Sequence, residues 1–451
     1  MEVTNNTGLG NPHYPRVLVV ALGRINEADS YNNGLLLRNL FGNWPREKLA
    51  QIYSSGDTGD AGFFGYYYRL GVQDRRFGSL FYRLKSKIQD KIARNTQTQS
   101  GHQPQPVSTA SLARRLLINT GLYELIFAPR VSLQMQAWVE EFRPDIIFSQ
   151  GYNLTFAWLP VLLKEATRAK LAFFCTDDWP TYLYAGLLGE PRLLRWLIGP
   201  IVRKAVSRLL AATDVPLAFG HSMAEEYATR YGKAFTFLCH ADDPKRFESA
   251  QPARVHRAGT FTLMAIGNFN RFRWPLLLDA DESCRLLNDQ GILARVAVLS
   301  SAIDPEGARR LAKALYIDIC DDPGNDRLPC YLKGADLLLL AEGFDEGYVP
   351  AIRLSISSKA HLFMFSQRPI IVYAHSDTGI AKYASACRWA RVVSRRDRQT
   401  LTEAIRELLI YNNEGNALIR EANQTARTFH SHDANQKRFF NAISGDAYSK
   451  E

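Results

Sequence analysis

The stretch FTLMAIGNFNRFR occupies residues 261–273 and combines an apolar run, a glycine and a charged end. Its first six residues are typical of a buried strand in a parallel sheet. Gly267 then permits a tight turn, and Arg271 and Arg273 follow at the carboxyl end of the strand. In open α/β sheets, ligands bind at that edge. The stretch therefore predicts a doubly wound α/β domain with a ligand site after this strand.

Similar apolar runs recur along the whole chain, each followed by an amphipathic stretch, as in parallel strands that alternate with covering helices. In the first half, the predicted strands span residues 16–22, 145–149, 170–175, 216–220 and 235–239. In the second half, they span residues 261–267, 295–299, 336–341, 369–374 and 390–394. Because 451 residues exceed what one hydrophobic core usually organises, the two series predict two doubly wound parallel-sheet domains.

The break between the two series lies at residues 242–259, which contain two prolines and a terminal glycine. Such residues mark linkers, so we expect a first domain at residues 1–250 and a second at residues 251–430. Residues 87–111 are polar, which predicts a flexible insertion within the first domain. Residues 431–451 predict a helix and a tail, which we expect to fold back on the first domain.

The composition is that of an ordinary folded protein with a net charge of +10, which favours an anionic partner. The basic residues are dispersed and form no nucleic-acid-binding signature, so we expect no nucleic acid. No apolar run is long enough to span a membrane, and the start lacks the pattern of a signal peptide, so we expect a cytoplasmic protein. The six cysteines are scattered without metal-ligand spacing, and we expect no metal and no bound cofactor.

The glycine turn at Gly267 and Asn268 leads into Arg271 and Arg273. Arginine carries a fixed charge and forked donors that suit phosphate oxygens, and such cations would stabilise the negative charge on a departing nucleoside diphosphate. A solvated basic turn would have the same composition. We assign all four residues to the binding of a donor substrate that carries a nucleoside diphosphate, and Arg271 also to catalysis.

The run Glu342-Gly343-Phe344 follows the apolar residues 337–340. Glycine at a strand end permits the close approach of a ligand, and carboxylates accept hydrogen bonds from sugar hydroxyls. An acidic surface loop is the alternative, because acidic residues are common in exposed turns. We assign Gly343 and Phe344 to donor binding and Glu342 to catalysis.

The run Ser357-Ser358-Lys359 is predicted to open a helix that reaches Ser366. Serines at a helix start leave backbone NH groups available to an anion, and a neighbouring lysine adds a positive charge. Helix capping alone would also explain the serines. We assign the three residues to donor binding, and Lys359 also to catalysis.

In the first domain, Asp177, Asp178 and Trp179 follow a predicted strand. Aromatic faces pack on sugar rings, and carboxylates hold hydroxyls or act as a base, so we expect an acceptor wall with Asp178 as its catalytic member. Two adjacent aspartates without further ligands are weak support for a divalent metal. Gly34 and Tyr152 are also assigned to substrate binding, although ordinary turn chemistry would explain both.

Together these residues resemble the retaining glycosyltransferases called glycosyl transferases group 1, whose GT-B fold has two Rossmann-like domains that face a cleft. The resemblance is most specific between Gly267 and Tyr373. Residues 357–369 are similar to the family's serine-threonine-lysine helix, which ends in glycine-arginine-proline. The resemblance implies a nucleoside-diphosphate sugar donor, transfer with retention of configuration at the anomeric carbon, and no metal.

The sequence departs from the family pattern at three places. Leu362 stands where members carry the glutamate that holds the donor ribose, and Leu354 stands where its partner glutamate is usual. The strand end at Gln150 lacks the family's acceptor-side histidine. Ribose contacts are therefore expected to differ, and a catalytically inactive protein that binds sugar nucleotides or glycans is a competing interpretation.

Residues 192–204 combine apolar and basic side chains, a composition suited to an anionic membrane surface. A covering helix with a basic exposed face would look the same. We expect transfer of a sugar to a saccharide or lipid-linked saccharide acceptor, in surface-polysaccharide or glycolipid synthesis, with possible contact to the inner face of the membrane. A GT-B sugar-nucleotide epimerase is the alternative enzyme.

Overall fold

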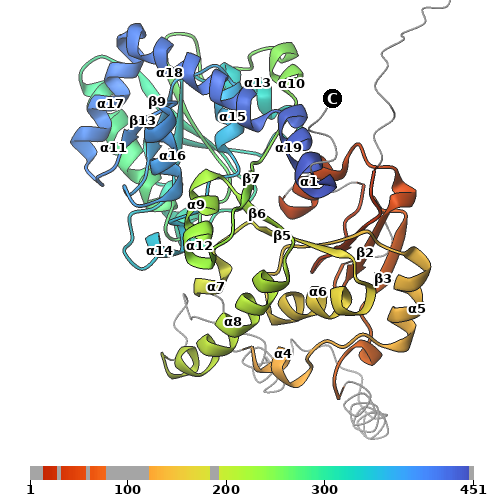
Figure 1. Ribbon diagram of the computed structural model, residues 1–451. Coiled ribbons are helices and arrows are strands. Elements are labelled where there is room, and N and C mark those ends of the chain that lie inside the picture. The colour runs from red at the N-terminus through yellow and green to blue at the C-terminus, as the bar shows by residue number, and fades with distance from the viewer. Residues whose placement is uncertain (1–13, 28–31, 57–60, 78–120, 183–191, 446–451) are drawn as a thin grey trace, which may run out of the picture.

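The computed structural model describes residues 14–27, 32–56, 61–77, 121–182 and 192–445. It contains two parallel β-sheets, one from each half of the chain, with helices around them (Figure 1). The predicted α/β class with two doubly wound sheets is therefore confirmed. The insertion predicted at residues 87–111 lies outside the described residues.

The first sheet has the strand order β3-β2-β1-β4-β5-β6-β7, with every neighbouring pair parallel. Its strands are β1 (Val17–Val20), β2 (Leu49–Tyr53), β3 (Tyr66–Arg69), β4 (Ile146–Ser149), β5 (Lys170–Cys175), β6 (Val215–Phe219) and β7 (Thr236–Leu238). The chain moves outward from β1 to β3 and then returns to the other side of β1 at β4. This reversal makes a switch point between β1 and β4, and ligands bind α/β sheets at such points.

The second sheet has the order β10-β9-β8-β11-β12-β13 and repeats the same pattern, with its switch point between β8 and β11. Its strands are β8 (Phe261–Ile266), β9 (Ala294–Leu299), β10 (Ile317–Cys320), β11 (Leu337–Ala341), β12 (Ile370–Tyr373) and β13 (Arg391–Val393). Alternate side chains of β8 enter two different cores, Leu263 on one face and Met264 on the other. Because both faces are covered, the central strands are continuous apolar runs.

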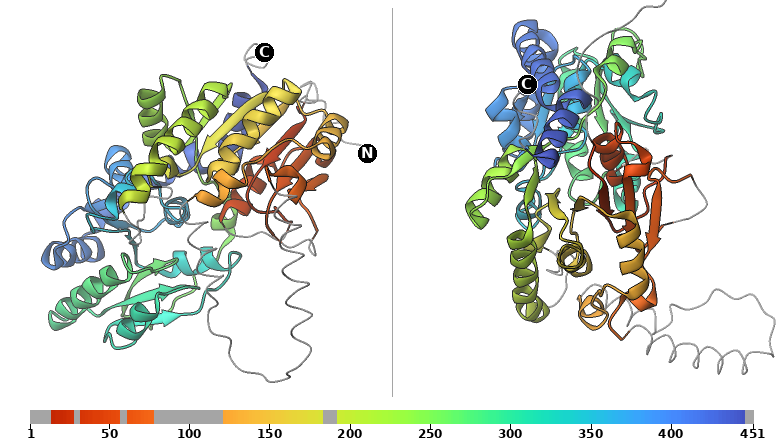
Figure 2. Two further views of the ribbon diagram at one scale, coloured as in Figure 1. Left: turned by 90° about the horizontal axis from the view of Figure 1, so that it is seen from below. Right: turned by 45° about the vertical axis from the view of Figure 1, so that its right-hand side comes forward.

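Helices surround both sheets (Figure 2). In the first half they are α1 (Asn32–Phe41), η1 (Arg46–Lys48), η2 (Val72–Asp74), α4 (Leu122–Ile126), α5 (Leu133–Phe142), α6 (Leu154–Thr167), α7 (Trp179–Tyr182), α8 (Arg192–Ala212), α9 (His221–Tyr231) and α10 (Pro244–Ser249). In the second half they are α11 (Trp274–Asp289), α12 (Pro305–Leu311), α13 (Leu328–Gly334), α14 (Val349–Ile352), α15 (Ala360–Phe365), α16 (Gly379–Cys387), α17 (Arg398–Ile410), α18 (Asn412–Thr425), η3 (Ala426–His430) and α19 (His432–Ser444).

The last helix, α19, returns to the first domain and contacts α1 and β7 (Figure 1). Phe439 is fully buried there, with its ring 5.1 Å from that of Phe41. The side chain of Asn435 hydrogen-bonds both backbone groups of Cys239 at 3.0 Å. Asp242 and Ser431 form a parallel bridge, so two crossings of the chain lie side by side between the domains.

Helix α8 contains the whole segment, residues 192–204, whose composition suits a membrane surface. Ile198, Val202 and Ala205 are buried in the protein core, whereas Arg203 and Lys204 are exposed. This distribution is that of a covering helix with a basic outer face. Within the described ranges, no helix is long and apolar enough to cross a bilayer.

Candidate functional site

A cavity of about 1100 Å³ lies between the two domains. Loops that follow strands of both sheets line it, including those after β1 and β4 and those after β8 and β11. The cavity therefore lies at both switch points. Ten predicted site residues line it: Gly34, Tyr152, Asp177, Gly267, Asn268, Arg273, Glu342, Ser357, Ser358 and Lys359. Five do not: Arg271, Asp178, Trp179, Gly343 and Phe344.

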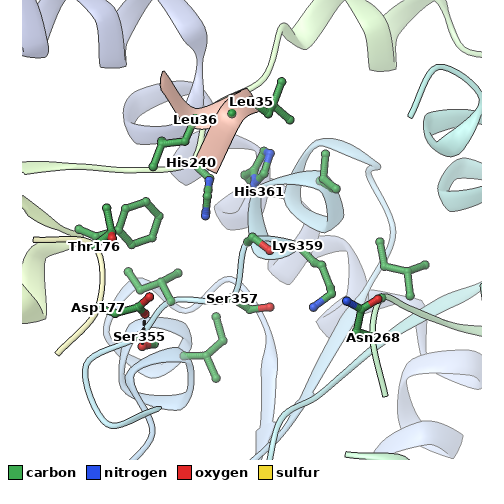
Figure 3. Close-up of a pocket in the computed structure, with 18 of the residues that line it drawn as sticks. Leu35, Leu36, Thr176, Asp177, His240, Asn268, Ser355, Ser357, Lys359 and His361 are labelled. Carbon is green, nitrogen blue, oxygen red and sulfur yellow. Dashed lines mark hydrogen bonds between the residues drawn. The ribbon is translucent and has the colours of Figure 1, made fainter. Parts of the chain in front are cut away.

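Lys359 extends along the second-domain wall of this cavity (Figure 3). Gly267 makes room for it, because a Cβ at residue 267 would lie 1.9 Å from the Lys359 Cε atom. Lys359 forms neither an ion pair nor a hydrogen bond with any residue that the structure describes. Burial lowers the pKa of Lys359, while Glu342 acts in the opposite direction. The cavity thus contains a partly buried ammonium group that has no ion-pair partner in the described part of the chain.

Arg273 and Glu342 form an ion pair across the β8 and β11 loops. Glu342 is almost fully buried, and its charge is the main cause of the raised pKa of Arg273. The Nε atom of Arg273 is buried and has no hydrogen-bond partner among the described residues. The pair is therefore close to neutral, and its arginine keeps one donor that a ligand can use.

The serines of residues 357 and 358 do not cap a helix, contrary to the sequence-based expectation. Helix α15 begins only at Ala360, and Lys359 occupies its N-cap position without a side-chain capping bond. The Ser357 hydroxyl is buried without a hydrogen-bond partner in the described part of the chain, whereas Ser358 is exposed. Ser357 therefore presents an unused hydroxyl beside Lys359, as Figure 3 shows.

Arg271 lies outside the lining of the cavity and is exposed. Its guanidinium group is 4.7 Å from the centre of the Phe272 ring. That ring stacks on Tyr348 at a centroid distance of 4.3 Å, and Tyr348 itself lines the cavity. The arginine that the β8 loop supplies to the cavity is therefore Arg273 and not Arg271.

Gly343 and Phe344 serve the packing of the β11 loop. The Phe344 ring lies 4.8 Å from the Tyr373 ring and packs, partly buried, against a second-domain core. A Cβ at Gly343 would lie 2.9 Å from the Tyr348 ring, so the glycine permits that aromatic side chain to approach. Of the three residues predicted in this run, the structure brings only Glu342 to the cavity.

Asp177 stands on the first-domain wall, directly after β5. Ser355 of the second domain donates a hydrogen bond of 3.2 Å to its Oδ1 atom, drawn as a dashed line in Figure 3. Burial is the largest cause that raises the pKa of Asp177 to about 6, although the Ser355 hydrogen bond lowers it. Beside Asp177, the Tyr152 hydroxyl hydrogen-bonds Thr176, and both residues line the cavity.

Asp178 and Trp179 do not form the expected acceptor wall. Asp178 is buried and bound by both terminal nitrogens of Arg230, at 2.8 and 3.1 Å, and by the Tyr227 hydroxyl at 2.9 Å. Trp179 is buried against Gly151, where a Cβ would lie 2.7 Å from the indole ring. Both side chains are used inside the first domain, which leaves neither free to bind a sugar.

The sequence analysis missed a residue that positions one of the lining loops. Gln51 in β2 is fully buried and holds the loop after β1 through hydrogen bonds to Gly23 (2.8 Å) and Ile25 (3.0 Å). A polar residue in the middle of a strand is the one sequence signal for such a role.

Two histidines, His240 and His361, also line the cavity and lie together in Figure 3. Their rings are 5.9 Å apart, and His430 continues the stack 6.0 Å beyond His361. The Tyr383 hydroxyl and the His240 carbonyl bind the two nitrogens of His430 at 2.9 and 2.7 Å. Burial lowers the pKa of His240 to about 3 and that of His430 to about 4, and it lowers the pKa of His361 well below its usual range. The stack is therefore neutral at physiological pH.

No group of three histidine, cysteine, aspartate or glutamate side chains is arranged to hold a metal ion in the described part of the chain. The polar groups of the cavity instead divide between two walls. The second-domain wall offers Lys359, Ser357 and Arg273, which suit an anion. The first-domain wall offers Asp177 and Thr176, which suit hydroxyl groups.

Comparisons with known proteins bear on the fold. No protein-family model matches the chain, and no curated protein matches its sequence. Sucrose-phosphate synthase from Thermosynechococcus elongatus is similar in structure, with a TM-score of 0.58 and 12% identity over 96% of this chain and 98% of that chain. Anabaena HepE in complex with UDP-glucose is also similar in structure, with a TM-score of 0.58 and 9% identity over 96% of this chain and 100% of that chain. A third similar structure is that of WaaG, a glycosyltransferase involved in lipopolysaccharide biosynthesis. Its TM-score is 0.53 and its identity 12%, over 95% of this chain and 100% of that chain.

These likenesses extend over nearly the whole of both chains, so they concern the two domains together and not one Rossmann-like half. Two doubly wound parallel sheets, with a cavity between their switch points, have the same organisation. The chain therefore has the GT-B fold, in which two Rossmann-like domains face a cleft.

Proposed function

We propose that this protein is a glycosyltransferase that moves a sugar from a nucleoside-diphosphate sugar to a saccharide or lipid-linked saccharide. The observation that carries the proposal is the ammonium group of Lys359, which is partly buried in the cavity and has no ion-pair partner among the described residues. A buried cation is costly unless an anion neutralises it, and a pyrophosphate is an anion of suitable charge and size.

The chemistry of glycosyl transfer explains why cations are needed at this wall. When the bond between the sugar and the diphosphate breaks, negative charge develops on the leaving phosphate oxygens. Lys359, the Ser357 hydroxyl and the Nε of Arg273 would stabilise this charge. In this role they take the place of Arg271, which the sequence predicted to bind the diphosphate and which lies outside the lining of the cavity.

The finer parts of the proposal have separate supports. The resemblance to the group 1 family implies retention of configuration without a metal. HepE was solved with UDP-glucose, and WaaG acts in lipopolysaccharide biosynthesis, which supports a sugar nucleotide as donor and a surface polysaccharide or glycolipid as product. We further propose action in the cytoplasm, with the basic outer face of α8 near the inner membrane surface. Pelleting with anionic liposomes at low salt tests this contact, and absence of pelleting contradicts it.

A donor screen followed by a turnover assay tests the activity. Thermal-shift measurements across nucleotide sugars identify a donor by its stabilisation of the folded state. Release of nucleoside diphosphate that depends on a saccharide acceptor supports the transferase. Release without any acceptor supports an epimerase instead.

One observation favours a second candidate, a binding protein without activity. Leu362 lines the cavity and stands where the related family carries its ribose-binding glutamate. An apolar side chain at this position cannot accept the ribose hydrogen bonds. Binding of a nucleotide sugar without turnover, with every acceptor class tested, would support this candidate.

A further inference from the structure

Four carboxylates line the cavity in the described part of the chain: Asp177, Asp242, Asp322 and Glu342. Arg246 pairs with Asp242 at 2.6 Å, and Arg273 pairs with Glu342. Asp322 is exposed and accepts a hydrogen bond within its own loop. Asp177 is the remaining one, partly buried and without a cationic partner among the described residues.

Only one of the two carboxylate oxygens of Asp177 accepts a hydrogen bond from a residue that the structure describes. Ser355 binds Oδ1, and no described residue donates a hydrogen bond to Oδ2. Figure 3 shows Asp177 at the edge of the cavity opposite Lys359. A carboxylate in such a place accepts hydrogen bonds and repels anions, so a hydrogen-bond donor without negative charge suits its free oxygen, and hydroxyl groups are the usual donors of a sugar.

We propose that Asp177 binds a hydroxyl group of a sugar substrate as an ionised carboxylate, and that Ser355 holds it in position from the other domain. The proposal rests on the glycosyltransferase function proposed above and adds a specificity-determining residue to it. The hydroxyl can belong to the acceptor or to the transferred sugar, which experiments separate. An acceptor with a phosphate at this position would be rejected by charge repulsion.

Ser355, which binds Asp177, and Lys359, which offers a positive charge to an anion, belong to the same segment, residues 355–359. Ser355 is separated from Lys359 by only three residues, and both line the cavity. Next to Ser355, Arg353 forms an ion pair of 3.0 Å with Glu226 of the first-domain helix α9. Binding of a diphosphate at Lys359 would therefore fix the residue that orients Asp177. This connection couples donor binding to sugar recognition on the opposite wall.

The other titratable groups that face Asp177 are held in one state near neutral pH. Asp178 lies in an ion pair with Arg230, and burial raises the pKa of both Tyr152 and Cys175 well above their usual values. Cys175 donates its thiol hydrogen to the backbone oxygen of Asp177 at 3.1 Å. Asp177, with a pKa raised to about 6, is thus the group on this wall that changes charge near neutral pH.

The experiment measures what the sugar adds to nucleotide affinity. Calorimetry at pH 8 compares UDP with UDP-glucose, ADP with ADP-glucose, and GDP with GDP-mannose, for the wild type and Asp177→Asn. Asparagine keeps the shape and loses the charge. For any donor that binds, we expect the preference for the sugar nucleotide over the bare nucleotide to fall about 10-fold or more if the transferred sugar is the ligand, as expected for loss of a charged hydrogen bond. If the acceptor is the ligand, this preference is unchanged and the acceptor KM rises by a similar factor.

A pH series separates this role from a merely structural one. In the wild type, either the preference for the sugar nucleotide should decrease or the acceptor KM should rise as the pH falls through about 6, because protonation removes the charge of Asp177. The dependence should move to higher pH in Ser355→Ala and disappear in Asp177→Asn. Glu225→Gln, at an exposed position of α9, is the matched control and should behave as the wild type.

The outcomes are distinguishable. If Asp177→Asn changes neither the sugar preference nor the acceptor KM at any pH, the inference is wrong while the transferase proposal stands. If none of the six nucleotides binds the wild type, the proposed function fails and the inference fails with it.

Discussion

The end of the Lys359 side chain occupies the space that a Cβ atom at Gly267 would need, because such an atom would lie 1.9 Å from the Lys359 Cε atom. Gly267 also has a φ of +113°, a conformation that other residues rarely adopt. Two features therefore favour glycine at position 267, directly after β8. One is the positive φ, and the other is the closeness of the Lys359 side chain, which we place at the diphosphate. This contact connects the turn to the chemistry of the cavity.

Replacing Gly267 by alanine is predicted to displace Lys359 and to lower nucleoside-diphosphate affinity by about 10-fold or more. Backbone strain alone would cost about 1 kcal/mol of stability. Gly291→Ala is the control, because Gly291 also has a positive φ of +79° but has open space around its Cβ direction. Calorimetry should show lost affinity in the first variant only. Equal affinities in both variants would contradict the steric role.

The two arginines of the β8 loop should respond differently to alanine. Arg273→Ala leaves Glu342 buried without its cation, which should destabilise the fold by about 3–5 kcal/mol in chemical denaturation. Arg271→Ala removes an exposed side chain and should change stability and nucleotide affinity by less than about 0.5 kcal/mol. A large loss of affinity in Arg271→Ala would show that the loop rearranges to bring this residue to the ligand.

Asp178→Asn is predicted to destabilise the first domain, because it removes the charge that Arg230 and Tyr227 surround. A loss of about 3 kcal/mol is the usual cost of breaking a buried pair. The neighbouring Asp177→Asn should not lower the unfolding midpoint and should raise it at neutral pH, since burial makes the ionised carboxylate costly to the fold and Asp177 has no cationic partner among the described residues. Thermal unfolding compares the two variants, and equal losses would mean that Asp177 is also structural.

Acid is predicted to destabilise the fold through the histidine stack. The folded state keeps His240 and His430 neutral down to pH values of about 3 and 4, whereas an unfolded chain binds protons below its ordinary pKa of 6.5. The unfolded state therefore gains protons first, and stability falls as the pH drops from about 6.5 toward 4. Each such histidine lowers the free energy of unfolding by up to about 1.4 kcal/mol for each pH unit in this range.

His361→Phe tests this account because the buried Nδ1 of His361 has no hydrogen-bond partner to lose among the described residues. The substitution keeps a stacked ring and removes one titrating group, so the fall in stability between pH 6.5 and 4 should become less steep. His221→Asn, at the exposed start of α9, is the control. An unchanged slope in His361→Phe would contradict the role of the stack.

The sequence predicted ten strands, and each lies on a strand of the structure. It missed β2, β3 and β10, whose residues do not read as simple apolar runs. Gln51 interrupts β2, three tyrosines and an arginine make up the edge strand β3, and Asp318 interrupts β10 with an ion pair to Arg295 at 2.6 Å. Hydrophobic patterning identifies buried central strands and fails where a polar side chain has a specific partner.

The site was predictable in its location but less so in its residues. Strand ends and glycines indicate where a ligand site lies, because parallel topology brings the loops together. The choice between Arg271 and Arg273 depends on the path of the turn, which the spacing does not reveal. Trp179 suits a sugar wall and a core equally well, and only its contact with Gly151 decides. The histidine stack joins three distant segments that have no common sequence signal.

The most direct test of the account is the affinity of Lys359→Ala for a nucleoside diphosphate, measured by calorimetry beside Lys313→Ala, an exposed lysine outside the cavity. The account predicts that Lys359→Ala weakens binding by about 1 to 3 kcal/mol, while Lys313→Ala binds as the wild type does. Equal binding by both variants would contradict the placement of the diphosphate at Lys359.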